Sequence, residues 1–484
     1  MKKRNDMLAL LLILAMALFA GCGGSSSNVP LSAANINLIF VASEDLTFNA
    51  PGDVDPDTAN LTNQGLQRSL LMATALKQQV LGNNNATSIY ALEPMTHLQT
   101  ANNYPDMAAL EGIQQFALLN QVTLYFDSVP VQANSYPVNT SYAANAVPSG
   151  VAPQLVSCIA CQGIDFSDAN GDNETLASSI IGAGVPGYYV FSAPWETIHS
   201  LLTNITKLKN YNLIVPKNYP GPNFVYAISI LPSGSASLVT FDAHLDPPST
   251  YPELPSPIPI STECKEQTPF SITVTGGSGG AIIPGGINTN ETIYFVRHAE
   301  AHPGVFDDGN YVCAGQWRAL DLPNALRGKI SPDEVYSIDP AQIIAGTADA
   351  AGNSNWSYVR PSLTVLPYAI ANGLPFNLVA GLEIFAQNPP ELATQASAFF
   401  FSDGGFSNRT VLVGWEHEHI PITVNALIAS YFPNGGGPTA PNWPTDDFDT
   451  IWTVTLDPAG NLTVDNTKCE GINSAALPEK CPQF

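Results

Sequence analysis

Two apolar stretches of the chain end in residues that could bind and attack an anion. Residues 293–296, Ile-Tyr-Phe-Val, run into Arg297 and His298, and residues 411–414, Val-Leu-Val-Gly, are soon followed by His417. A guanidinium holds a tetrahedral oxyanion by its charge and paired N–H donors, and a neutral imidazole is a nucleophile. An Arg-His pair at the end of a buried strand can therefore hold a phosphate and attack its phosphorus.

A second guanidinium is expected in the same place. Arg360 and Pro361 lead into an apolar helical pattern, and a further apolar helix is expected from about Pro421, just after His417. In α/β proteins such residues meet at the carboxyl edge of the sheet. Taken alone, Arg297 and His298 could be a structural pair. Their place at a strand end, followed by Arg360 and His417, favours an anion site.

The chain is predicted to be a duplication. An earlier strand, residues 38–41, runs into Ala42 and Ser43 instead of Arg-His, and four further pairs of segments recur in the same order. These pairs are 65–70 with 315–320, 90–94 with 336–340, 195–198 with 417–420, and 225–230 with 451–456. The offsets fall from about 255 to about 222, so the first copy carries roughly thirty extra residues.

Each copy alternates short apolar strands with helical patterns, which predicts an α/β fold with mostly parallel sheets covered on both faces. The closing segments of both copies alternate in polarity and are expected to be antiparallel at an edge. We expect copies over 35–246 and 291–466, a Pro/Gly-rich linker over 247–290 and a Cys-containing tail over 467–484. Thr273 and Val274 in the linker could add a short edge strand.

The second copy resembles the histidine phosphatase superfamily, whose fold is phosphoglycerate-mutase-like. The residues that carry the resemblance are Arg297-His298-Ala299-Glu300, the Gly315/Arg318 helix, Tyr336 to Pro340, Arg360, and Val411 to His417. The resemblance implies two tandem three-layer α/β/α units, the first of them degenerate. The sequence departs from the family pattern at two places. Ala299 stands where Gly is usual, and Ser337-Ile338-Asp339-Pro340 lacks the usual Arg.

The resemblance also implies roles for the site residues. His298 would be the nucleophile that forms a phosphohistidine, Arg297 and Arg360 would bind the phosphate, and His417 would stabilise the transferring group. It implies no metal and no cofactor. Glu418 is the favoured proton donor, which requires a partly buried carboxyl.

Several neighbouring residues are alternative candidates or are expected to have a structural role. Glu300 and Glu383 are alternative candidates for the proton donor. Glu416 is expected to contact the site residues and not the substrate. His302 and His419 are expected at the rim of the pocket, and Arg318 is expected to form structural ion pairs.

The first copy is predicted to be catalytically inactive. Ala42, Ser43, Trp195 and approximately Ala108 stand where the second copy has Arg297, His298, His417 and Arg360, so a phosphate would meet neither a cation nor a nucleophile. A Ser43–His199 hydrolase pair is rejected because no third partner accompanies it. We expect this copy to buttress the second one or to shape its entrance.

The N-terminus indicates export. Three basic residues precede an apolar run over 7–20, too short to span a bilayer comfortably, and residues 18–22 resemble a bacterial lipobox ending at Cys22. By that resemblance, residues 1–22 are a signal peptide with a lipidated Cys22, and 23–34 form a tether. Simple secretion is the alternative. We therefore expect a cell-envelope protein held at the membrane by its lipid, in the outer membrane if the envelope is Gram-negative.

The net charge and the number of cysteines limit the classes of partner and the redox environment that the sequence allows. Loss of the signal peptide moves the net charge from −24 to about −26, which repels nucleic acid and anionic lipid heads. The six other cysteines suit disulfides outside the cytosol, in any of about 15 pairings. Cys158 and Cys161 could instead be a redox or zinc half-site, although structural bridging is favoured.

The sequence thus predicts a lipid-anchored phosphatase for a small phosphorylated substrate, metal-independent, with no nucleic-acid partner and an unknown protein partner. The alternative is a binding or structural lipoprotein in which the second copy has also lost turnover.

Overall fold

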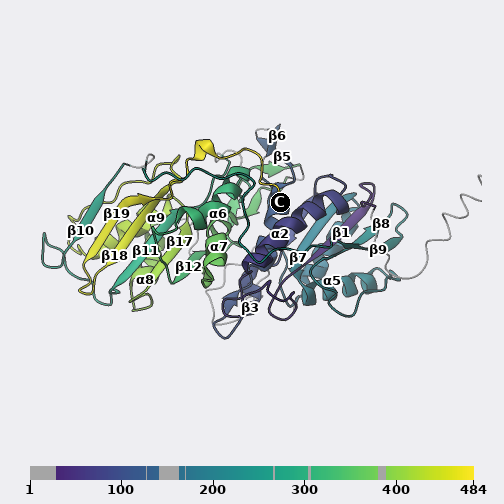
Figure 1. Cartoon of the computed structure of the whole chain (residues 1–484), viewed down its shortest axis with the longest axis horizontal. Helices are drawn as coiled ribbons and strands as arrows, with labels where there is room; N and C mark the ends of the chain where they lie inside the picture. The colour runs from purple at the N-terminus through teal and green to yellow at the C-terminus, as the bar shows by residue number, and fades with distance from the viewer. Residues whose placement is uncertain are drawn as a thin grey trace, which may run out of the picture.

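The computed structural model of the protein describes residues 29–126, 128–133, 135–140, 163–168, 170–264, 268–302, 307–350, 352–379 and 389–484. Its strands form two large sheets, one in each half of the chain (Figure 1). The predictions for Cys22, Cys158, Cys161 and Glu383 concern residues outside the described ranges.

The first sheet has five strands in the order β2-β7-β1-β8-β9. Its central strand β1 pairs in parallel with β7 and antiparallel with β8, while β2 is parallel to β7 and β9 antiparallel to β8. The bounds are β1 Ile36–Ser43, β2 Ser88–Ala91, β7 Gly187–Pro194, β8 Phe224–Ile230 and β9 Ala236–Asp242.

The second sheet has seven strands in the order β10-β19-β18-β11-β17-β12-β16. Strands β11, β17, β12 and β16 are parallel, and β18, β19 and β10 complete an antiparallel edge. The bounds are β10 Ser271–Val274, β11 Glu291–Arg297, β12 Glu334–Ile338, β16 Phe376–Val379, β17 Thr410–Trp415, β18 Thr450–Leu456 and β19 Leu462–Cys469. The edge strand expected at Thr273 and Val274 is confirmed as β10.

The first sheet and the middle of the second have the same arrangement. Strands β2-β7-β1-β8-β9 and β12-β17-β11-β18-β19 share order and relative direction. The α/β class and the antiparallel closing strands are confirmed. Both sheets are mixed, with parallel strands followed by an antiparallel meander at one edge.

Helices cover both faces of each sheet. The alternating side chains of β1 show this, since Ile39 and Val41 pack with α2 and α3, while Leu38 and Phe40 pack with α4 and α5. In the second sheet α6 and α7 cover one face and α8 and α9 the other. The bounds are α2 Asn63–Ala75, α3 Ala108–Leu118, α4 Asp172–Ala183, α5 Trp195–Leu208, α6 Cys313–Ala325, α7 Arg360–Asn372, α8 Pro389–Phe401 and α9 His419–Ser430. Both halves are therefore three-layered.

The two halves, called the first and second units below, share a hydrophobic core. One continuous cluster of buried residues includes Leu66 and Phe116 of the first unit and Leu363 and Leu366 of the second. Helices α2, α6 and α7 lie between the two sheets (Figure 1). Burial of this apolar surface stabilises the contact between the units. On the other face of each sheet, the buried clusters belong mainly to one unit.

Short elements also join the units. Strands β5 (Val122–Phe126) and β6 (Val129–Ala133) of the first unit form a small sheet with β14 (Ala348–Asp349) of the second. The other short strands are β3 (Leu98–Gln99), β4 (Tyr104–Pro105), β13 (Ile343–Ala345) and β15 (Asn355–Ser357). A π-helical turn continues α2 over Leu76–Val80, and 3₁₀ turns span Pro94–Thr96 and Ser474–Ala476.

Disulfides fix the C-terminal segment. Cys264 pairs with Cys469 and Cys313 with Cys481, which resolves two of the pairings that the sequence left open. Gln115 of α3 donates to the Pro482 carbonyl and Thr74 of α2 to that of Phe484, so the tail reaches into the first unit. Among the described residues, no helix is both long and apolar enough to cross a membrane.

Candidate phosphate site

His298 lies directly after the central strand β11, where its backbone N–H donates to the Trp415 carbonyl of β17. The residue is only 3% exposed. Its Nδ1 lies 2.8 Å from the Ala299 carbonyl oxygen. Because a carbonyl can only accept, Nδ1 carries the proton, and Nε2 is left with a free lone pair. Tyr358 and Phe448 meet the ring edge-on and hold it in place.

The surroundings of His298 keep its ring neutral. Burial, together with the positive charges of Arg360 and Arg297, holds the pKa of the His298 imidazole well below its usual value. An uncharged imidazole at neutral pH is the state that a nucleophile requires.

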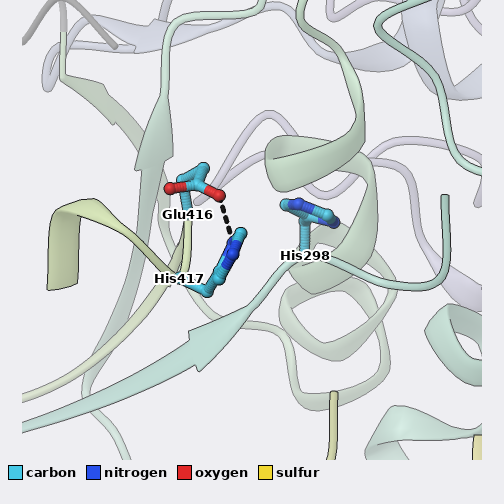
Figure 2. Close-up of side chains that lie close together, drawn as sticks. All are labelled: His298, Glu416 and His417. Carbon is cyan, nitrogen blue, oxygen red and sulfur yellow. Dashed lines mark ion pairs between the residues drawn. The ribbon is translucent and has the colours of Figure 1, made fainter. Parts of the chain in front are cut away.

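His417 and Glu416 approach His298 from the neighbouring strand. Both follow β17, and one ligand atom from each of the three residues lies within 4.8 Å of the other two. Figure 2 shows the three side chains converging from the ends of two strands. The structure thus brings together His298 and His417, which lie 119 positions apart in the chain.

Glu416 connects the histidines that follow β17. One of its carboxylate oxygens is in ion-pair contact with His417 Nδ1, and the other lies 3.2 Å from His419 Nδ1. Burial opposes ionisation of Glu416, but its bonds to His417 and His419 outweigh burial and hold its pKa well below the usual value. Glu416 is therefore a buried anion that orients His417.

Arg297 is the last residue of β11 and is held by the segment before β18. Its Nη1 donates to the carbonyls of Thr445 (2.5 Å) and Asp447 (3.2 Å), and its guanidinium stacks on the Phe448 ring at 3.9 Å. Burial lowers its pKa to about 10, so it remains positive at neutral pH. Its buried Nε–H has no hydrogen-bond partner among the described residues and can donate to an anion.

Arg360 begins α7 and is bound by a carboxylate that the sequence did not predict. Its Nη1 and Nη2 lie 2.5 and 3.0 Å from the two oxygens of Asp307, and its guanidinium stacks on Tyr358 at 4.4 Å. Burial opposes the charge, but Tyr358 and Asp307 raise the pKa of Arg360 above its usual value. Its buried Nε likewise has no partner in the described part of the chain.

Two glycines allow Arg360 to lie this close to the sheet. A Cβ on Gly414 of β17 would meet Val365 of α7 at 2.7 Å, so any side chain would push the helix away. Gly309 has φ +78° and lies against Ser357, and its carbonyl accepts from the N–H of Arg360. Only glycine adopts this conformation without strain at such a close approach.

The favoured proton donor does not meet the condition set for it. Glu418 is the residue just before α9 and is exposed, so the prediction that its carboxyl is partly buried is wrong. Glu300, the competing donor, is bound by Arg318 in a buried ion pair, with Nη2 to Oε1 at 2.6 Å. Arg318 also binds Glu470 at 2.5 Å, which agrees with the structural role expected for it.

Asp307 and Phe448 were missed by sequence reasoning, and Glu416 was named only as a support. Asp307 belongs to the loop after the Arg-His motif, where aspartate carries no distinctive pattern. Phe448 contacts Arg297 from a segment 151 positions away and gave no signal at all. Glu416 is adjacent to His417, so its position could have been found from the motif alone.

The corresponding strand end of the first unit has a different chemistry. Ala42 and Ser43 end β1, Trp195 begins α5 and Ala108 begins α3, as the sequence alignment predicted. A cation is nevertheless present: Arg68 lines a cavity beside Ser43, which corrects the expectation of none. Arg68 is bound by Asp53 at 2.5 Å, and the cavity of about 30 Å³ holds little more than a water molecule.

Two solved structures each match about a third of this chain and nearly all of their own. A mycobacterial glucosyl-3-phosphoglycerate phosphatase is 13% identical, with 36% of this chain and 97% of that chain covered and a TM-score of 0.24. The protein histidine phosphatase SixA in complex with tungstate is 18% identical, with 36% and 96% covered and a TM-score of 0.23. No protein-family model and no curated protein matches the sequence. At these TM-scores the likeness carries no argument on function, which rests on the site geometry.

Proposed function

We propose that the second unit is a phosphatase that hydrolyses phosphomonoesters through a phosphohistidine on His298. The observation that carries the proposal is the state of the imidazole. Its Nδ1 is fixed on the Ala299 carbonyl, and its free Nε2 lies in a buried site with Arg297, Arg360 and His417. A neutral, oriented nucleophile beside two guanidinium groups matches what phosphoryl transfer requires.

In the first step, the Nε2 lone pair of His298 forms a bond to phosphorus while the bond from phosphorus to the leaving oxygen breaks. The leaving oxygen takes up a proton. Water then attacks the phosphohistidine, which releases inorganic phosphate and frees Nε2. The Nε groups of Arg297 and Arg360 bind the non-bridging oxygens, where charge accumulates in the transition state.

Glu418 remains our proposed proton donor, because Glu416 and Glu300 are both held by cationic or histidine partners. Its carboxyl must turn from its exposed position toward the leaving group. His417 stabilises the transferring phosphoryl group, and Glu416 fixes its orientation.

We further propose that the chain is a duplication whose first unit has lost catalysis. The shared order of five strands supports the duplication, and the lack of Arg and His at the end of β1 supports the loss. The first unit buttresses the site: Gln114 and Asn310 exchange amide hydrogen bonds, and the Thr140 N–H donates to Ser357 beside Tyr358. A lipid anchor on Cys22 in the cell envelope is proposed from the sequence alone.

The full chain should hydrolyse p-nitrophenyl phosphate in the presence of EDTA. His298→Ala should abolish turnover, and Arg360→Gln should lower kcat by about a hundredfold to a thousandfold. Ser43→Ala, at the corresponding strand end of the first unit, is the matched control and should leave the rate unchanged.

Acid quenching with a radiolabelled substrate should trap one phosphoryl group on His298. Labelling of another residue would contradict the mechanism. Absence of turnover and of labelling from pH 4 to 8 would instead support the alternative, a binding lipoprotein with no activity.

A further inference from the structure

The cluster formed by His298, Glu416 and His417 has a second chemical capacity that its phosphate chemistry does not use. Two imidazoles and one carboxylate are the protein ligands of many zinc sites, with a further position left open. Each residue offers one ligand atom, and the three atoms lie within 4.8 Å of one another. Among the described ranges, no other group of three or more such side chains is this close.

The orientation of His298 suits a metal ligand. A ligating histidine usually donates its other ring N–H to a carboxylate or a backbone carbonyl, which fixes the ring and its tautomer. His298 Nδ1 is held in this way by the Ala299 carbonyl, so the Nε2 lone pair is available. Glu416 is positioned similarly, because it accepts from the Glu418 N–H at 2.6 Å while it contacts His417.

The charges near the cluster do not exclude a cation. Arg297 and Arg360 are positive, but Asp307 binds both terminal nitrogens of Arg360, and two backbone carbonyls bind Arg297. Asp307 and Glu416 offset two of the four positive charges that the guanidinium groups and a divalent metal would carry together. The three ligands are mostly buried, with exposed side-chain fractions of 13% for His417 and 9% for Glu416.

We propose that this cluster binds a borderline-soft divalent transition metal, with zinc as the natural candidate, through His298 Nε2, His417 and the Glu416 carboxylate. The bound metal occupies the lone pair that would attack phosphorus, so metal and phosphoryl transfer exclude each other. The inhibitory consequence rests on the proposed function, whereas the binding itself does not.

The test uses the full chain, stripped with EDTA and titrated with Co²⁺, whose visible d–d absorption reports ligation by the protein. We expect one equivalent of Co²⁺ to bind and Zn²⁺ to displace it. His298→Ala and Glu416→Gln should each weaken binding by about tenfold or more. Thermal unfolding of each metal-free variant shows whether it is folded.

Two controls separate this cluster from other donors. His244 lies 3.3 Å from Asp242 with an 83% exposed side chain, so His244→Ala removes a surface pair of similar chemistry. A double variant, Cys158→Ser with Cys161→Ser, removes the CxxC thiols. Both should keep the wild-type Co²⁺ spectrum and stoichiometry.

The inference is overturned if no d–d absorption develops, or if it persists unchanged in folded His298→Ala. A chain that binds Co²⁺ at the cluster without hydrolysing p-nitrophenyl phosphate would uphold this inference and contradict the phosphatase. A chain that binds no Co²⁺ and hydrolyses p-nitrophenyl phosphate at a rate unaffected by Zn²⁺ would contradict this inference and uphold the phosphatase.

Discussion

At the scale of single residues, Asp307 is a competitor for the anion that Arg360 would bind. Its carboxylate contacts one N–H of each terminal nitrogen, which leaves the Nε–H and the second N–H of each terminal nitrogen for a phosphate oxygen. It also places a negative charge beside the site of a dianion, which disfavours anion binding. Phosphate bound to Arg360 would therefore lie beside the negative charge of Asp307 or displace it.

Asp307→Asn should tighten the binding of inorganic phosphate and vanadate. The amide removes the repelling charge and weakens the hold on Arg360, which we expect to lower the Kd by roughly tenfold, or about 1.4 kcal/mol. Isothermal titration of the full chain with each anion gives the measurement. Weaker binding in the variant would show that Asp307 serves to position Arg360 and does not compete with phosphate.

Arg318 illustrates a purely structural cation. It is fully buried and binds Glu300 and Glu470, so its loss leaves two buried carboxylates without their partner. Arg318→Met should lower the free energy of unfolding by about 3–5 kcal/mol. Urea denaturation would measure this, with Arg327→Met as the control, since Arg327 is an exposed arginine just beyond the same helix. Equal losses in both variants would refute the argument.

Residue types at strand ends made the Arg-His motif and His417 predictable, because a short sequence segment defines each of them. The partners of these residues were not predictable. Asp307 meets Arg360 across 53 positions, and the contact depends on a glycine turn whose geometry the sequence does not specify. The prediction that Glu418 is partly buried was wrong. Glu416 and Glu418 both precede α9, and the direction in which this helix begins decides which of the two carboxyls faces inward.

At the scale of elements, corresponding strands of the two units meet end to end. Glu93 follows β2 and Asp339 follows β12, positions that the sequence comparison aligns, and both residues are 0% exposed. Burial together with the neighbouring Asp339 raises the pKa of Glu93 well above its usual value, and burial raises that of Asp339 to about 6. Each carboxyl keeps one buried oxygen without a donor, so the pair requires a shared proton.

This pair should make stability depend on pH. In the unfolded chain both carboxyls titrate near pH 4. Between about pH 4 and the raised folded values, the folded state binds more protons, so its stability falls as pH rises. Below pH 4 both states are protonated and the penalty is absent.

Glu93→Gln should therefore reduce the loss of stability between pH 5 and pH 8 by on the order of 2 kcal/mol, because the amide donates to Asp339 at every pH. Chemical denaturation at the two pH values measures the difference. Glu253→Gln, at an exposed carboxyl of the linker, is the matched control. An unchanged pH dependence in Glu93→Gln would contradict the shared proton.

The apolar pattern of the sequence predicted several of these elements to within a few residues, for example the strand at residues 38–41, observed as β1, and the helix from about Pro421, observed as α9. It did not predict that β14 would pair with β5. Strands of two to five residues are too short for an alternating pattern to indicate their pairing. In addition, the partner strand lies in the other unit.

At the scale of the whole molecule, the two units are one folding block. They share one hydrophobic cluster, the small sheet β14-β5-β6 and the contacts of the C-terminal tail. The full chain should therefore unfold in a single calorimetric transition, because opening either unit exposes the core of the other. Two resolved transitions in a scan of the oxidised chain would contradict this. The Cys313→Ser variant provides a comparison in which the tail is released from α6.

The route of the tail has a consequence for biosynthesis. The Gln115 side chain donates to the Pro482 carbonyl, which lies 367 positions further along the chain. During synthesis, helices α2 and α3 lack the hydrogen bonds that Pro482 and Phe484 accept in the folded chain. The first unit therefore completes these contacts only after the strands of the second unit have been synthesised.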